Sequence, residues 1–165
     1  GYFASDTLRE RVDLVIHETA AWQPGQGATS SSGLRMDYWH NSLRMIREHP
    51  LLGVGTGGFE KAYAEKIQGS NMAPSNNPHN QYLLTTAQLG LVGLVLLLYL
   101  FFQHWRSAAW LPSVFEQDMA RGVLLTIMSG SLLNSLLLDH AEGLFFAWMS
   151  GVLFAGYSAV RRREQ

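Results

Sequence analysis

Cysteine is absent from the 165 residues of this chain, and neither sign of charge is in excess. Without cysteine there is no disulfide framework, thiolate zinc site or cysteine nucleophile. The 12 Lys and Arg and 13 Asp and Glu give a formal net charge of −1. Such a balance lacks the positive potential that draws proteins to nucleic acid, so we expect no nucleic-acid partner. His-Glu-x-x-His and similar ligand patterns are also missing, and we expect neither a metal site nor a cofactor.

Charged residues are unevenly distributed along the chain. Residues 1–78 carry 15 of the 25 charged side chains, whereas the second half contains uncharged runs at 83–102, 122–138 and 143–160. The first run has 20 residues, about the length of a helix that crosses a hydrocarbon core, and the others have 17 and 18. The pattern predicts an all-α, polytopic membrane fragment, with a helical outer region followed by three transmembrane helices. A soluble all-helical bundle is the alternative, because core helices can have the length of the shorter runs.

The charges that flank these runs predict how the chain is oriented. Arginines follow the first and third runs, and acidic residues fill the link between the second and third. Because positive residues favour the cytoplasmic side, we expect the acidic link outside and the C-terminus inside. The expected segments are an extracytoplasmic region at 1–82, spans at 83–103, 122–138 and 143–160, a cytoplasmic loop at 104–121, an outer turn at 139–142 and a cytoplasmic tail at 161–165. Since the chain has no initiator Met and no signal peptide, we expect it to be cut from a longer polytopic protein.

The outer region is long enough to form helices of its own. Apolar residues at helical spacing and capping residues predict helices at 5–18, with Ser5 or Asp6 as the cap, at about 33–48, ended by Pro50, and at 59–67. Polar residues predict loops at 22–33 and 68–78.

Four glycines lie within 53–58, just before the third of these helices. Their backbone N–H groups could hold a phosphate. The spacing matches neither a Walker loop nor the dinucleotide fingerprint, and a tight turn between two helices is the preferred interpretation.

Two residues stand out as candidates for chemistry. His79 lies between asparagines a few residues before the first uncharged run, and an ionisable group at a membrane interface is a functional candidate. The alternative is a histidine that merely ends a loop. Arg35 follows a Ser/Gly-rich loop, and a guanidinium binds two diphosphate oxygens at once. For Arg44 and Arg47, pairing with Asp37 or Glu48 on the same helix is the preferred interpretation.

Several short motifs follow one another along the chain. The first group is Ser32-Gly33-Leu34-Arg35, Trp39, Ile46, His49-Pro50-Leu51-Leu52-Gly53-Val54-Gly55, Gly58-Phe59 and Tyr63, and the second is Asn77-Pro78-His79-Asn80, Tyr82-Leu83, Gly90 and Gly93-Leu94. Their order and spacing resemble the O-antigen ligase and polymerase superfamily, and the second group looks like the end of that family's large periplasmic loop. The resemblance covers roughly residues 33–102, and three closing spans fit the family's C-terminal end.

The resemblance implies a bacterial inner-membrane glycosyltransferase that acts on the periplasmic side. Such an enzyme takes a glycan from undecaprenyl diphosphate, and ligases pass it to a hydroxyl of lipid A–core. By position, His79 matches the family's proposed general base, and Arg35 matches the arginine that engages the carrier diphosphate. Asn77, Asn80 and Trp39 are expected to support the substrate. The family uses a further arginine in an earlier loop, which this chain lacks, so the fragment alone should be inactive.

The implied reaction is an inverting, metal-independent displacement. No Asp-x-Asp occurs in the chain, so arginine rather than a bound cation is expected to meet the diphosphate. Polymerases and protein O-oligosaccharyltransferases of the superfamily share these motifs and remain alternatives. A non-enzymatic transporter or scaffold is the alternative of another class, but transporter sites lie near the bilayer midplane. Here the candidate groups lie outside the runs, and Asn134 is the amide within the second.

Overall fold

The computed structural model describes residues 6–155, and every regular element in that range is an α-helix. The helices are α1 (Asp6–Ala21), α2 (Ser31–Glu48), α3 (Phe59–Ile67), α4 (Gln81–Ala108), α5 (Val114–Gly130) and α6 (His140–Phe154). The expected all-α fold is therefore confirmed. Ser5, residues 156–160 of the third expected span and the tail at 161–165 lie outside the described residues.

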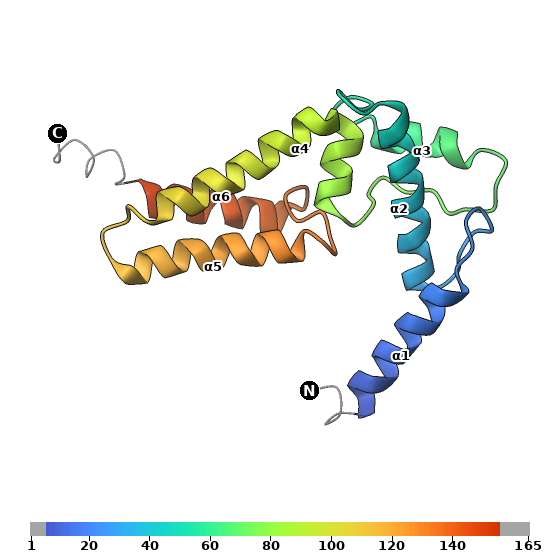
Figure 1. The fold of residues 1–165 in the computed structure, drawn as a ribbon, viewed down its shortest axis with the longest axis horizontal. Coiled ribbons are helices and arrows are strands. Elements are labelled where there is room, and N and C mark those ends of the chain that lie inside the picture. Colours follow the sequence, from blue (N-terminus) through green and yellow to red (C-terminus); the bar gives the residue numbers. More distant parts are fainter. Residues whose placement is uncertain (1–5, 156–165) are drawn as a thin grey trace.

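The helices form an outer part and an elongated arm (Figure 1). The outer part contains α1, α2, α3 and the first turns of α4, whereas the rest of α4 lies beside α5 and α6 in the arm. Helix α1 has no buried residue and extends away from the other helices. The outer part is held together by α2, α3 and α4.

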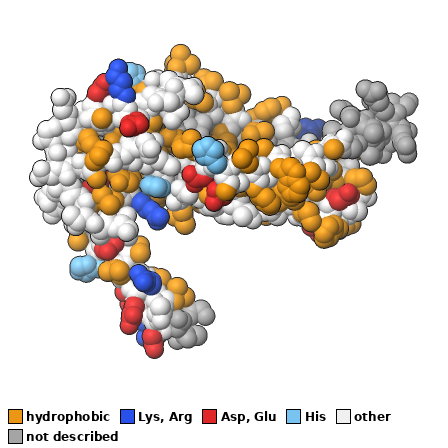
Figure 2. Space-filling view, turned by 180° about the vertical axis from the view of Figure 1, so that it is seen from behind, with side chains coloured by type: hydrophobic (Ala, Val, Ile, Leu, Met, Phe, Trp, Pro, Cys, Tyr) orange, Lys and Arg blue, Asp and Glu red, His pale blue; other side chains and the backbone are white. Residues whose placement is uncertain are grey.

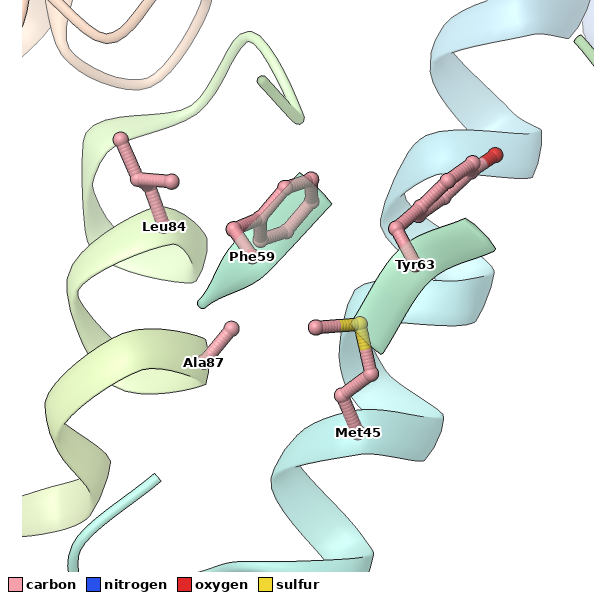
Figure 3. Packing of buried hydrophobic residues seen from close by; sticks show 5 residues of the cluster. All are labelled: Met45, Phe59, Tyr63, Leu84 and Ala87. Atoms are coloured by element: carbon pink, nitrogen blue, oxygen red, sulfur yellow. The ribbon is translucent and has the colours of Figure 1, made fainter. Parts of the chain in front are cut away.

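A small apolar core joins α2 and α3 to the beginning of α4 (Figure 3). Its buried side chains are Met45, Phe59, Tyr63, Leu84 and Ala87. The rings of Phe59 and Tyr63 stack with centroids 5.7 Å apart, and burial raises the pKa of Tyr63 to about 12. This core fixes α2 against the end of α4 from which the chain enters the arm.

An ion pair at the edge of the outer part joins α2 and α3. Lys66 of α3 donates to the Glu48 carboxylate at the end of α2, and this hydrogen bond lowers the pKa of Glu48. As expected, α2 ends at Glu48, just before Pro50, and α3 has the expected bounds.

Helix α4 is broken at Gly90, where φ is 67° and ψ is −163°. The break frees backbone groups that the loop at 50–55 then satisfies. The N–H groups of Val54 and Gly55 donate to the carbonyls of Ala87 and Gln88 at 2.9 Å each, and those of Leu91 and Val92 donate to the carbonyls of Pro50 and Leu51 at 2.8 and 3.4 Å. A broken helix beside apolar surface is tolerated when neighbouring groups supply such bonds.

The same bonds decide between the two interpretations of the glycine-rich run. Besides Val54 and Gly55, the N–H of Gly57 donates to the Gln88 side chain at 3.0 Å and that of Gly58 to the Gly55 carbonyl at 3.0 Å. These donors are occupied within the chain and cannot cradle a phosphate. The run is a tight turn that packs on α4.

The arm presents a largely apolar surface (Figure 2). Among the described residues, one helix, α4, is long and apolar enough to cross a membrane. Many of its side chains beyond the break are exposed: Leu91, Val92, Val95, Leu96, Leu98, Tyr99, Leu100 and Phe102. Helices α5 and α6 have 17 and 15 residues. That they span a membrane with α4 remains a prediction.

Several helix boundaries in the arm differ from the expected segments. Helix α5 begins at Val114, inside the expected loop at 104–121, and α6 begins at His140, inside the expected turn at 139–142. Helix α4 continues to Ala108, so His104, expected in a loop, is buried inside the arm. Its Nε2 is 3.1 Å from the Ala120 carbonyl, and its ring stacks on Phe146, which explains why the helix continues past this polar residue. Helix α5 ends at Gly130, and the rest of the uncharged run forms turns at 131–139. Polar groups in these turns bond to the chain at the start of α4, as described below.

We expect the substitution Gly90→Ala to destabilise the protein. A Cβ at this position would lie 2.1 Å from the Leu51 carbonyl oxygen, and a positive φ in a non-glycine residue costs about 1–3 kcal/mol even without such a clash. Thermal unfolding of the full-length protein in detergent measures the effect.

Gly122→Ala in α5 is the matched control, because a Cβ there meets nothing within 4 Å. That change should raise the free energy of unfolding by about 0.5–1 kcal/mol, since alanine is the better helix former. Equal melting temperatures for the two variants would contradict the close packing at Gly90.

Candidate functional site

His79 lies in the short segment that leads into α4. Among residues 6–155 it is the one non-glycine residue with a positive φ, 52°. This left-handed conformation costs a β-carbon-bearing residue roughly 1–2 kcal/mol. The Asn77 side chain stabilises it, because its Oδ1 accepts the N–H of His79 at 2.8 Å. The next residue, Asn80, caps α4 by accepting the Leu83 N–H at 2.9 Å.

The turns at 131–139 pack directly against this segment (Figure 1). Besides the contact of the His79 ring described below, four hydrogen bonds connect them. Asn80 Nδ2 donates to the Leu132 carbonyl at 2.9 Å, the Gln81 N–H to the Ser131 carbonyl at 2.9 Å, Ser135 Oγ to Asn77 Oδ1 at 2.7 Å and the Leu137 N–H to Gln81 Oε1 at 3.0 Å. Residues 50 or more positions apart in the chain are thereby held in a defined register.

Asn134, which lies in these turns, contacts the ring of His79. Asn134 Oδ1 lies 3.2 Å from Nδ1 of His79, and Asn134 Nδ2 donates to Asp139 Oδ2 at 2.7 Å. The His79 ring also lies 6.0 Å from the ring of Tyr38 in α2, at an interplanar angle of 36°. His79 is half-buried. The histidine therefore lies between α2 and the turn before α6.

The two asparagines beside His79 have backbone partners in the structure. Asn77 holds the His79 N–H and the Ser135 hydroxyl, and Asn80 uses both its oxygen and its nitrogen on backbone groups. The residue that contacts the ring is Asn134, which the sequence distinguished only as an amide in an apolar run. Asp139 was noted only as a flanking charge, and no local signal connects it with a histidine 60 positions earlier.

Trp39 and Arg35 share the face of α2 that meets this segment. Trp39 Nε1 donates to the carbonyl of Pro78 at 3.0 Å, next to His79. Arg35 lies one helical turn earlier, and residues four apart occupy the same helix face. Its side chain is exposed and makes no hydrogen bond or ion pair with any other residue of 6–155. The guanidinium is thus available to a ligand on the side of α2 where His79 lies.

The other cations and acids of α2 have different partners from those expected. Asp37 is buried and accepts from Trp22 Nε1 and from the Ala28 N–H, both at 2.8 Å, so it anchors the loop before α2. Arg44 donates to Asn41 at 3.3 Å, and Glu48 pairs with Lys66. Neither Arg44 nor Arg47 forms the expected ion pair with Asp37 or Glu48, although after Lys66 and His49 the charge of Arg44 also helps to lower the pKa of Glu48.

Two parts of this arrangement have complementary chemistry. One is an exposed guanidinium, which suits a diphosphate oxygen. The other is an imidazole with one nitrogen held by an amide and the other without a protein partner among the described residues. Within 6–155, no three His, Cys, Asp or Glu side chains gather as metal ligands.

The region of the chain that matches known proteins includes several residues of this site. A family model described as O-antigen ligase matches residues 3–98, which include Arg35, Trp39 and His79. An uncharacterized protein of Haemophilus influenzae is 27% identical over 95 residues, which make up 55% of this chain and 24% of that protein. The chain thus spans about a quarter of the length of this relative.

We expect Asn77 and Ser135 to be energetically coupled. Asn77→Ala leaves the fully buried Ser135 hydroxyl without its acceptor, which costs about 1–3 kcal/mol. Once Ser135→Ala is present, Asn77→Ala should cost less, and residues in contact typically couple by about 0.5–3 kcal/mol. Thermal unfolding of both single variants and the double variant measures this coupling.

Asn76→Ala is the control, because Asn76 is exposed and lies one position away. It should change the free energy of unfolding by less than about 0.5 kcal/mol. Strictly additive effects of the Asn77 and Ser135 changes would show that this hydrogen bond does not hold the two segments together.

Proposed function

The chain belongs to the O-antigen ligase family, and on that premise we propose that it contributes part of the active site of a membrane glycosyltransferase. The enzyme moves a glycan from undecaprenyl diphosphate to an acceptor hydroxyl, that of lipid A–core, at the periplasmic face of the bacterial inner membrane. The observation that carries this proposal is the position of His79 beside the α2 face that bears an unpaired Arg35, directly before a long apolar helix.

The membrane arrangement that we propose keeps the three expected spans, at 83–103, 122–138 and 143–160, with the helix of the second ending at Gly130 and the turns after it at the periplasmic interface. Residues 1–82 lie in the periplasm and the C-terminus lies in the cytoplasm. The apolar exposed surface of α4 beyond Gly90 supports the first span. His79 lies just before α4, so this arrangement puts it at the periplasmic interface. That is where the diphosphate of a lipid carrier and a water-exposed acceptor can meet.

Arg35 is proposed to bind the diphosphate of the carrier. Its guanidinium keeps its charge at all accessible pH values and can contact two oxygens at once. As the bond between the anomeric carbon and the phosphate oxygen breaks, negative charge grows on the leaving diphosphate, and a positioned cation stabilises it most in that state. The step therefore needs no divalent cation as the source of positive charge.

His79 is proposed to act as general base on the acceptor. Its Nε2 takes the hydroxyl proton while the acceptor oxygen attacks the anomeric carbon from the side opposite the diphosphate, which inverts that centre. General-base assistance of this kind contributes about 10²–10⁴-fold. The proton ends on His79, the glycan on the acceptor and the bonding electrons on the diphosphate of the carrier.

We expect His79→Ala and Arg35→Ala in the full-length protein to reduce glycan transfer by at least about 10²-fold, because each removes a group that acts in the transition state. Transfer from an undecaprenyl-diphosphate glycan by the purified protein measures this loss, and immunoblots of membranes check that protein levels are normal.

Arg44→Ala is the matched control, since Arg44 is also an exposed arginine of α2 but bonds to Asn41 on another face. It should retain most of the activity. Normal transfer by the His79 or Arg35 variant would refute the role of that residue.

Deletion of the whole gene identifies the acceptor. A ligase predicts loss of all capped lipopolysaccharide with accumulation of carrier-linked polymer. Lipopolysaccharide capped with single repeats would instead assign a polymerase. Unchanged lipopolysaccharide with lost glycoproteins would assign a protein glycosyltransferase.

A further inference from the structure

The contact between Asn134 and Asp139 determines which way the Asn134 amide faces. An ionised carboxylate offers only hydrogen-bond acceptors, so the group 2.7 Å from Asp139 Oδ2 must be the amide nitrogen of Asn134. The carbonyl oxygen of the same amide is then turned toward His79, 3.2 Å from Nδ1. Asp139 thus acts on the histidine through the amide.

An amide oxygen facing Nδ1 selects one tautomer of the neutral imidazole. The oxygen can only accept, so Nδ1 carries the proton and Nε2 keeps its lone pair. A lone pair on Nε2 is what a general base requires at the nitrogen that has no protein partner. The reverse tautomer would set a lone pair against the Asn134 oxygen and leave Nε2 unable to accept a proton.

The turns around Asn134 give this contact a fixed geometry. Ser131, Leu132, Ser135 and Leu137 each bond to the segment at 77–81, so the residues on both sides of Asn134 are anchored to the chain that carries His79. Both ends of the Asn134 amide are occupied within the protein. It therefore orients the histidine and is not available to hold a sugar.

We infer that Asn134 and Asp139 are positioning residues that keep His79 in the tautomer with the proton on Nδ1 and support the positive charge when Nε2 takes a proton. This inference rests on the proposed function of His79 as a base and adds two residues beyond the 3–98 region of the family match. The negative charge of Asp139 lies one amide away from the imidazolium that forms. Such a third group orients the base in other acid–base sites.

Exchange of the two side chains tests this inference in the full-length protein. Asn134→Leu keeps the size of the side chain but removes both hydrogen bonds. Asp139→Asn removes no capping hydrogen bond at the start of α6, because the Asp139 side chain makes none there, but it allows the Asn134 amide to turn either way. Asn134→Asp alone sets two carboxylates against each other. In the double variant N134D/D139N, the carboxylate at 134 accepts both from His79 Nδ1 and from the amide at 139, so every bond is restored.

We expect Asn134→Leu to lower kcat by about 10–100-fold, the usual cost of losing an outer group that orients an active side chain, with little change in KM for the lipid-linked donor. Asp139→Asn should lower kcat by a smaller factor, because the Asn134 amide can still turn its oxygen toward Nδ1. The double variant should recover most of the lost kcat. Asn76→Leu, at an exposed position in the loop that precedes His79, is the control and should leave kcat unchanged.

The protonation of the ring supplies a readout that a purely structural role would not move. ¹⁵N NMR of histidine-labelled protein, with the His79 signal assigned from the His79→Ala variant, should show the proton on Nδ1 in the unmodified protein. In Asn134→Leu the two tautomers should mix, and the double variant should restore the proton to Nδ1.

The inference is overturned if Asn134→Leu retains full kcat and the same tautomer, or if the double variant recovers neither while it folds. Should Asn134→Leu fail to accumulate in membranes, the comparison of Asp139→Asn with the double variant still decides. If His79→Ala transferred glycan at the normal rate, that separate result would refute the proposed function of His79. It would not by itself test the positioning role of Asn134 and Asp139.

Discussion

Backbone amides and carbonyls beside apolar surface must all find hydrogen-bond partners, and this constraint organises the structure around the first turns of α4. Two irregular segments supply the partners. The loop at 50–55 satisfies the groups freed by the break at Gly90, and the turns at 131–139 bond to residues 77–81. Since one loop follows α2 and the other precedes α6, the first turns of α4 and the segment just before them join the outer part to the arm.

The candidate site lies where the outer part and the arm meet. Its cation comes from α2, its histidine from the segment before α4 and the amide that holds the histidine from the turns before α6. None of these elements would place the groups together by itself. The strained φ of His79 is retained because hydrogen bonds from both sides hold the backbone in place.

Sequence reasoning predicted the elements better than their contacts. The end of α2 before Pro50 and both ends of α3 follow from local rules of capping and periodicity. The end of α5 at Gly130 could not be predicted, because the residues after it are as apolar as a helix requires. Their turns form through bonds to residues 50 positions earlier. For the same reason His79 could be selected from its local surroundings, whereas Asn134 and Asp139 could not be connected with it.

The break at Gly90 also has a mechanical consequence. A glycine with a positive φ inside a helix can act as a hinge. Here, however, the residues on both sides of the break form hydrogen bonds with the loop at 50–55. Bending at this point would break bonds on one side or the other. These hydrogen bonds therefore oppose a change in the angle between the two parts of α4. Because the loop continues directly from α2, they also tie the end of that helix to the start of the apolar part of α4.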